Sequence, residues 1–172
     1  MYFMKKAFLL FIACSMLNTY CYSQKMTPTK LGTMLETISD SIVSNTSQWR
    51  FIIKNTPFVA IADSTHNRMR IMSPIIESNN LSEELKTATL MANFHTALDV
   101  KYAISDGILW SVYIHPLKEL TENQVLDAVS QVYYAKVNFG TTFSSTSLVF
   151  PGKKPKKENP KSTKKNKLID KM

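Results

Sequence analysis

Three short strand-like runs, two of which alternate large apolar residues with charged ones, constrain this fold more than any other feature of the chain. The runs are WRFIIK (49–54), FVAIAD (58–63) and RMRIMS (68–73). In the third run, for example, Met69 and Ile71 alternate with arginines. An alternation with a period of two residues puts successive side chains on opposite faces of a strand. The runs therefore predict neighbouring antiparallel strands with one buried face.

Three longer segments, 29–44, 81–94 and 121–139, carry the three-to-four spacing of amphipathic helices. Ser82 and Thr121 are candidate N-caps of the second and third helices. The first helix is expected to bury Leu31, Met34, Leu35, Ile38 and Ile42. The second is expected to bury Leu81, Leu85, Ala88, Leu90 and Met91.

Two further strands, 99–104 and 108–114, flank the turn sequence SDG (105–107). A two-residue Asp-Gly loop would pair Ile104 with Leu109 and would split the apolar residues between both faces. A three-residue loop pairs Ile104 with Ile108. It gathers on one face Val100, Tyr102, Ile104, Ile108, Trp110 and Val112. One residue of register moves a whole set of side chains, so we expect the three-residue loop, with Gly107 left-handed in a bulge.

The element order is therefore helix, three strands, helix, two strands, helix. This order predicts an α+β fold, with helices packed on an antiparallel five-stranded sheet. The domain is expected to span 24–150. Its last residues, TTFSSTSLVF (141–150), are expected to be irregular or briefly extended.

The first 23 residues have the pattern of a secretion signal. Lys5 and Lys6 precede eleven apolar residues, AFLLFIACSML (7–17), a run too short to span a bilayer. The small residues Cys21 and Ser23 suit cleavage before Gln24. These features predict an exported protein, periplasmic or associated with the envelope. The alternative is a lipoprotein, because FIAC loosely resembles a lipobox with Cys14 as the lipidated residue.

Charge is concentrated at the two ends of the chain. The whole chain has a net charge of +8. The segment 151–172 holds nine lysines and two acidic residues, whereas 24–150 has ten basic and eleven acidic residues. The domain is thus close to neutral, which argues against nucleic-acid binding inferred from the charge of the whole chain.

The segment 151–172 has little to bury and is expected to be disordered. Its lysines could contact anionic lipids, polyanionic glycans or nucleic acid, or could only aid solubility. No aromatic residue is interleaved to stack on bases, so specific nucleic-acid recognition is not expected. The candidate anionic-surface residues are Lys153, Lys154, Lys156, Lys157, Lys164, Lys165 and Lys167.

Sites for catalysis or metal binding are not expected. Both cysteines precede Gln24, so a chain cleaved there has neither disulfides nor cysteine-ligated zinc. The chain has four glycines and no phosphate-binding glycine loop or GxSxG motif. His95, Asp99 and His115 could bind a metal only if the fold made them converge. We interpret them as polar residues at the ends of strands and helices, and we expect no cofactor.

The element order resembles that of the class I type III secretion chaperones and of the YbjN domain family. The most specific likeness lies in LMANFHTALDVKYAISDGILWSVYIHPL (90–117), followed by FGTTFSS (139–145). The resemblance covers roughly 30–148. It implies a non-enzymatic binding domain, often a homodimer, that holds an extended segment of a client protein. An export signal and a near-neutral domain depart from cytosolic secretion chaperones, so type III secretion itself is not carried over.

The function expected from these observations is that of an exported, chaperone-like module that binds a protein or peptide client. The alternative is an envelope adaptor docked through its basic tail or through a lipid on Cys14. An enzyme or metalloprotein is a third hypothesis. Aromatic residues and methionines of the strands are the candidate partner contacts. Methionine is common on adaptable binding surfaces, and core packing is the alternative interpretation that the sequence favours for most methionines. The candidate contacts are Trp49, Phe51, Met69, Met72 and Trp110.

Overall fold

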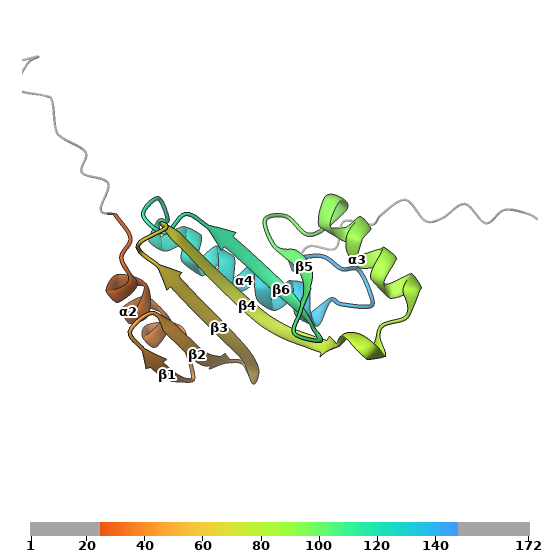
Figure 1. Cartoon of the computed structure of the whole chain (residues 1–172), viewed down its shortest axis with the longest axis horizontal. Coiled ribbons are helices and arrows are strands. Elements are labelled where there is room, and N and C mark those ends of the chain that lie inside the picture. The colour runs from red at the N-terminus through yellow and green to blue at the C-terminus, as the bar shows by residue number, and fades with distance from the viewer. Residues whose placement is uncertain (1–24, 148–172) are drawn as a thin grey trace, which may run out of the picture.

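A six-stranded antiparallel sheet forms the centre of the molecule, with helices along one face and one end (Figure 1). The structure is a computed structural model that describes residues 25–147. The signal segment, Cys14, residues 148–150 and the lysine-rich tail lie outside the described residues, so the predictions made for them stay predictions. The expected α+β class is confirmed, but the sheet has six strands rather than five.

The strands lie in the order β1-β2-β3-β4-β6-β5 across the sheet. Their bounds are β1 Ser41–Asn45, β2 Gln48–Ile53, β3 Thr56–Asp63, β4 Arg68–Glu77, β5 Lys101–Ser105 and β6 Ile108–His115. The first four strands follow one another as a meander. The chain then passes through a short 3-10 turn, Ser78–Asn80, and helix α3 before returning along β5 and β6.

The additional strand is β1, and it lies in the segment that the sequence analysis assigned to the end of the first helix. Helix α2 (Pro28–Ile38) ends early, where the backbone of Ser39 turns extended. The expected helix 29–44 is therefore wrong beyond Ile38. Asp40 fixes the change of direction, since its backbone N–H donates to Ile52 and its carboxylate accepts from the N–H of Lys54, both at 2.8 Å. Ile42 fits helical spacing, but as a β-branched residue it also suits a strand beside β2.

The other two helices begin at the predicted caps. The Ser82 hydroxyl accepts from the N–H of Leu85 at the start of α3 (Glu83–His95). Thr121 and Gln124 form a reciprocal capping box at the start of α4 (Glu122–Val137). Each cap satisfies backbone donors that have no partner inside the helix.

The hairpin between β5 and β6 has a two-residue loop, so the expected three-residue loop is wrong. Ile104 pairs with Leu109, and Ser105 pairs with Ile108. The left-handed conformation of Gly107 is confirmed at φ +74°, but Asp106 is left-handed too, at +51°. Positive φ at both central residues is typical of a type I′ turn, whose twist matches that of the two strands of a hairpin. Leu109 therefore faces the core, and Trp110 faces the opposite side.

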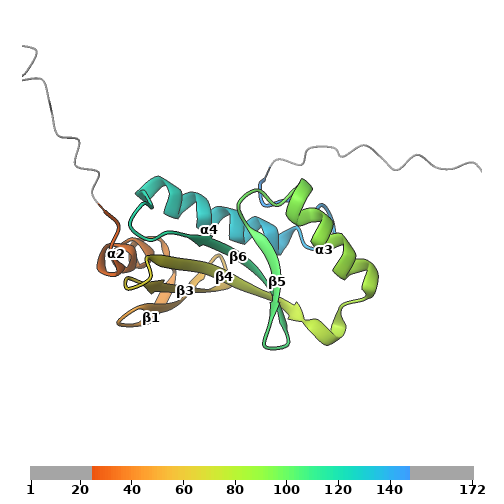
Figure 2. The same ribbon diagram turned by 45° about the horizontal axis from the view of Figure 1, so that its top comes forward.

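The helices α2 and α4 cover the same face of the sheet (Figure 2). Helix α4 lies across β4 and β6, while α2 lies against β1 and β2. The core between the layers includes Leu31, Leu35, Trp49, Phe51, Phe58, Met69, Ile71, Leu109, Val125 and Val132. Phe51 and Phe58 stack with ring centroids 5.2 Å apart.

Buried hydroxyl groups join α4 to the hairpin of β5 and β6. The Tyr102 hydroxyl donates to the carbonyl of Ala135 at 2.7 Å, and the Ser111 hydroxyl donates to that of Val132 at 3.1 Å. Burial raises the pKa of Tyr102, so the phenol stays neutral and can donate. Phe139 and Phe143 pack their rings near that of Tyr102, which holds the irregular residues after α4 against the domain.

A substitution at Gly107 tests the hairpin. Apart from its two chain neighbours, no residue has an atom within 4 Å of a Cβ added at Gly107, so Gly107→Ala imposes only backbone strain. The expected loss in unfolding free energy is about 1–2 kcal/mol, measured by urea denaturation. Asp106→Asn is the matched control and should leave stability nearly unchanged, because asparagine tolerates this conformation. Equal stability of Gly107→Ala and the unmodified chain would contradict the turn described.

Candidate functional site

One face of the sheet has no helix on it, and this open sheet face is the main candidate site (Figure 2). The strand registers place its side chains in rows that run across the strands. The first row is Ser41, Ile52, Pro57, Pro74, Trp110 and Ala103. The second is Val43, Arg50, Val59, Met72, Val112 and Lys101. The third is Asn45, Gln48, Ile61, Arg70 and Ile114.

The open sheet face is mainly apolar although solvent reaches it. Val43 is 75% exposed and Ile114 is 56% exposed, whereas Trp110, Met72 and Val112 are half-buried by their neighbours. A contiguous apolar surface on several neighbouring strands is unusual for a free domain and is typical of a binding surface.

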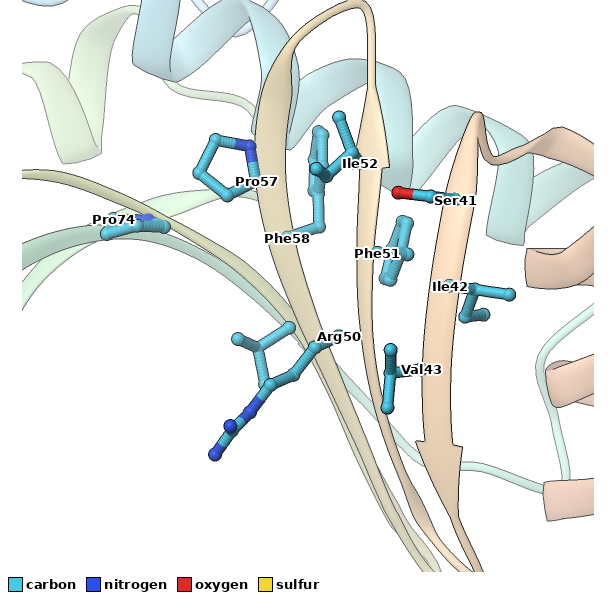
Figure 3. Close-up of a pocket in the computed structure, with 10 residues that line it drawn as sticks. Ser41, Ile42, Val43, Arg50, Phe51, Ile52, Pro57, Phe58 and Pro74 are labelled. Atoms are coloured by element: carbon cyan, nitrogen blue, oxygen red, sulfur yellow. The ribbon is translucent and has the colours of Figure 1, made fainter.

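Two shallow hollows lie on the open sheet face. The first lies over β1, β2 and β3, and Figure 3 shows Ser41, Ile52 and Pro57 around it, with Arg50 extending away from the sheet. The second, of about 410 Å³, lies over β3 to β6 and has Trp110 and Met72 in its lining. Both hollows are open to solvent and lined mainly by apolar residues.

The charge of this face is positive. Arg50 and Arg70 are exposed, and neither forms an ion pair or hydrogen bond with any residue in 25–147. At the rim, the Asp63 carboxylate accepts from the N–H groups of His66 and Thr65, and the first of these contributes most to lowering its pKa. The Asp106 carboxylate accepts from the Ser105 hydroxyl. The two arginines are thus charges without an intramolecular counterion among the described residues.

Helix α3 carries a second apolar surface. Its exposed residues Leu90, Met91 and Phe94 lie on one side, and Phe94 is 85% exposed. Leu98 follows the helix, and Ile104 on β5 is also exposed. We call these five residues the α3 patch. The expectation that Leu90 and Met91 would be buried is wrong, because the side of the helix that faces the domain is the one with Thr89 and Ala92.

The outer edge of β5 is partly blocked beside this patch. The Asn93 side chain accepts from the N–H of Tyr102 at 2.7 Å and donates to its carbonyl at 3.1 Å. An amide side chain thus takes the place of a neighbouring strand at this residue, which protects the edge from pairing.

The candidate partner contacts from the sequence divide between the two faces. Trp49, Phe51 and Met69 lie in the core with at most 4% of their surface exposed, so the folded domain offers little of them to a partner. Met72 and Trp110 lie on the open sheet face. The predicted lysine contacts of the tail lie outside the described residues.

Other residues of this face were not nominated from the sequence, and they include Arg50, Ile61, Arg70, Val112 and Ile114. The period-two alternation did identify Arg50 and Arg70 as lying opposite the core. Only the registers show that apolar residues of other strands surround them.

His95, Asp99 and His115, which the sequence analysis considered as possible metal ligands, take part in separate local structures. His95 lies at the end of α3, and the His115 ring stacks on Tyr113 at the end of β6. Asp99 accepts from the side-chain amide of Gln131 at 3.2 Å, while its N–H donates to Gln131 at 3.0 Å. Within 25–147, no group of three histidine, cysteine or acidic residues is placed to hold a metal ion. Nor does any helix in that range have the length and apolar character needed to cross a membrane.

Comparison with known proteins gives a likeness of fold. No protein-family model matches the chain, and no curated protein matches it significantly. A chain from the structure of the HopA1-SchA chaperone-effector complex is similar, with a TM-score of 0.52 and 11% sequence identity. The match covers 64% of this chain and 90% of that chain. The fold therefore resembles that of a type III secretion chaperone.

Tryptophan fluorescence tests the placement of the two faces. Trp49 is buried and Trp110 is half-exposed on the open sheet face, and they are the two tryptophans of the chain. Trp110→Phe should shift the remaining emission to shorter wavelength and reduce acrylamide quenching, because Trp49 is shielded. Trp49→Phe, the matched control, should leave a red-shifted, readily quenched emission. The reverse pattern would show that the assigned faces are exchanged.

Proposed function

We propose that this chain is a non-enzymatic, chaperone-like module that holds a segment of a client protein on its open sheet face. The observation that carries the proposal is an apolar surface spread over six strands, with the helix layer confined to the other side. The resemblance to a chain of a chaperone-effector complex supports it at the level of fold. Burying such a surface against a client would remove apolar area from water, which stabilises a complex.

Cross-linking in living cells tests this proposal. A photoreactive phenylalanine analogue at position 110 lies on the open sheet face, and the same analogue at exposed Ser130 on α4 is the control. We expect a recurrent protein attached at position 110 and absent at position 130, identified by mass spectrometry. Equal labelling at both positions, or no protein at position 110, would contradict the proposal.

We also propose that the chain forms a homodimer through the α3 patch. The five side chains of the patch are uncharged, so a second copy can meet the same surface across a two-fold axis without charge repulsion. The open sheet face is less suited to self-association, because two copies would place Arg50 and Arg70 against the same arginines. The two surfaces therefore suit different partners.

Substitution in the α3 patch tests the dimer. Phe94→Asp would bury a carboxylate at the centre of the interface, so it should convert the dimer into a monomer, measured by light scattering. Val43→Asp makes a similar change at an exposed apolar residue of the open sheet face and should leave the mass unchanged. A monomeric mass for the unmodified chain would refute the dimer, and so would a dimer that persists in Phe94→Asp.

Export remains part of the proposal, on the basis of the charged, apolar and small-residue pattern of the first 23 residues. The mature protein isolated from the envelope or periplasm should begin at Gln24, as determined by N-terminal sequencing. A mature protein that begins with a lipid-modified Cys14 would instead favour the envelope-adaptor alternative. An uncleaved chain in the cytosol would contradict both.

A further inference from the structure

We infer that the open sheet face binds an acidic amphipathic helix, whose apolar stripe lies on the apolar rows and whose carboxylates meet Arg50 and Arg70. The inference rests on the proposed function and gives the client segment a conformation and a charge. It follows from three properties of the face: the paired backbone of its central strands, its positive charge, and the distance between its two arginines.

The backbone of the central strands favours a helix over an extended segment. β3, β4 and β6 each have a strand on both sides, so their main-chain groups are used within the sheet. An extended peptide gains main-chain hydrogen bonds at a free edge and not on a face. A helix satisfies its own backbone and needs only side-chain contacts. Helix α4 covers the other face of β4 and β6 in this way.

The charge of the face favours acidic residues in that helix. Arg50 and Arg70 have no counterion within the described residues, and the oxygens of Asp63 and Asp106 accept from nearby donors. Lys101 keeps its positive charge, but its ammonium group is held beside the start of β5, where it donates to the carbonyls of Ala97 and Leu98. A guanidinium binds a carboxylate through two parallel hydrogen bonds, which orients as well as attracts a partner.

The same charge argues against other occupants of the face. A second copy would bring its own Arg50 and Arg70 against these arginines. The segment 151–172 of this chain has a net charge of +7 and would also be repelled. The occupant we infer is therefore a different protein.

The spacing of the arginines sets the spacing of the acidic residues. Arg50 on β2 and Arg70 on β4 are separated by β3, so they lie roughly 10 Å apart across the strands. They also lie one row apart, which adds roughly 7 Å along the strands. Acidic residues seven apart on one side of a helix are separated by about 10.5 Å. Two long arginine side chains can reach carboxylates at that spacing.

Direct binding of two designed peptides tests the inference on the purified full chain. The acidic probe is a fluorescein-labelled helical peptide with a leucine stripe and glutamates seven residues apart, and the basic probe has lysine at each glutamate. Fluorescence anisotropy should show tighter binding of the acidic probe. Arg50→Gln/Arg70→Gln should weaken that binding about tenfold, since two partly exposed ion pairs are lost.

The matched control removes two positive charges elsewhere. Lys86 on α3 and Lys118 after β6 are not part of the rows of the open sheet face. Lys86→Gln/Lys118→Gln should leave the affinity for the acidic probe nearly unchanged. Replacing the seven candidate tail lysines with glutamine should also preserve the dependence on Arg50 and Arg70, which separates this face from the tail.

Two outcomes of the peptide-binding assay would overturn the inference. One is equal binding of the acidic and basic probes. The other is an equal loss of affinity in the arginine and lysine variants, which would indicate attraction to net charge alone. A client cross-linked at position 110 through a segment without acidic side chains would also overturn it, while leaving the proposed function intact. Arginine-dependent binding of the acidic probe without any cross-linked client would support the chemistry of the face and contradict the proposed function.

Discussion

The register of β5 against β6 is the constraint on which the rest of the structure depends. The two-residue Asp106–Gly107 turn pairs Ile104 with Leu109, and this pairing turns Leu109, Ser111 and Tyr113 toward α4. The alternate residues then lie on the opposite side. A shift of one residue would exchange the two sets. It would put Trp110 in the core, remove the Ser111 hydrogen bond to α4, and bring Leu109, Ser111 and Tyr113 to the open sheet face in place of Trp110, Val112 and Ile114.

The one-sided helix layer gives the domain two apolar surfaces of different electrostatic character. The whole domain is nearly neutral, but Arg50 and Arg70 make the open sheet face positive, while the α3 patch has no charged member. An uncharged surface can pair with its own copy, whereas a positive one favours a partner of opposite charge. The net charge of a domain therefore says little about how its separate surfaces select their partners.

Many polar groups of the domain stabilise its own structure. Gln131 joins α4 to the backbone before β5, Asn93 covers the edge of β5, and Asp63 fixes the turn before β4. Asp99, which the sequence analysis considered as a possible metal ligand, pairs with Gln131 in the same network. These hydrogen bonds give each of the four side chains a structural role.

The sequence by itself determined the class of fold, the caps of α3 and α4, and most strand positions, because these depend on local periodicity and on side chains within a few residues. It did not determine the strand at Ser41–Asn45, since Ile42 satisfies helical and strand spacing equally. It also misassigned the hairpin, because apolar residues occupy both faces of β6 and periodicity cannot rank two apolar faces. Tertiary structure decided both the first strand and the register of the hairpin. Residues 41–45 form a strand because they pair with β2. The helices cover one face of the sheet and leave Arg50, Arg70 and Trp110 together on the other.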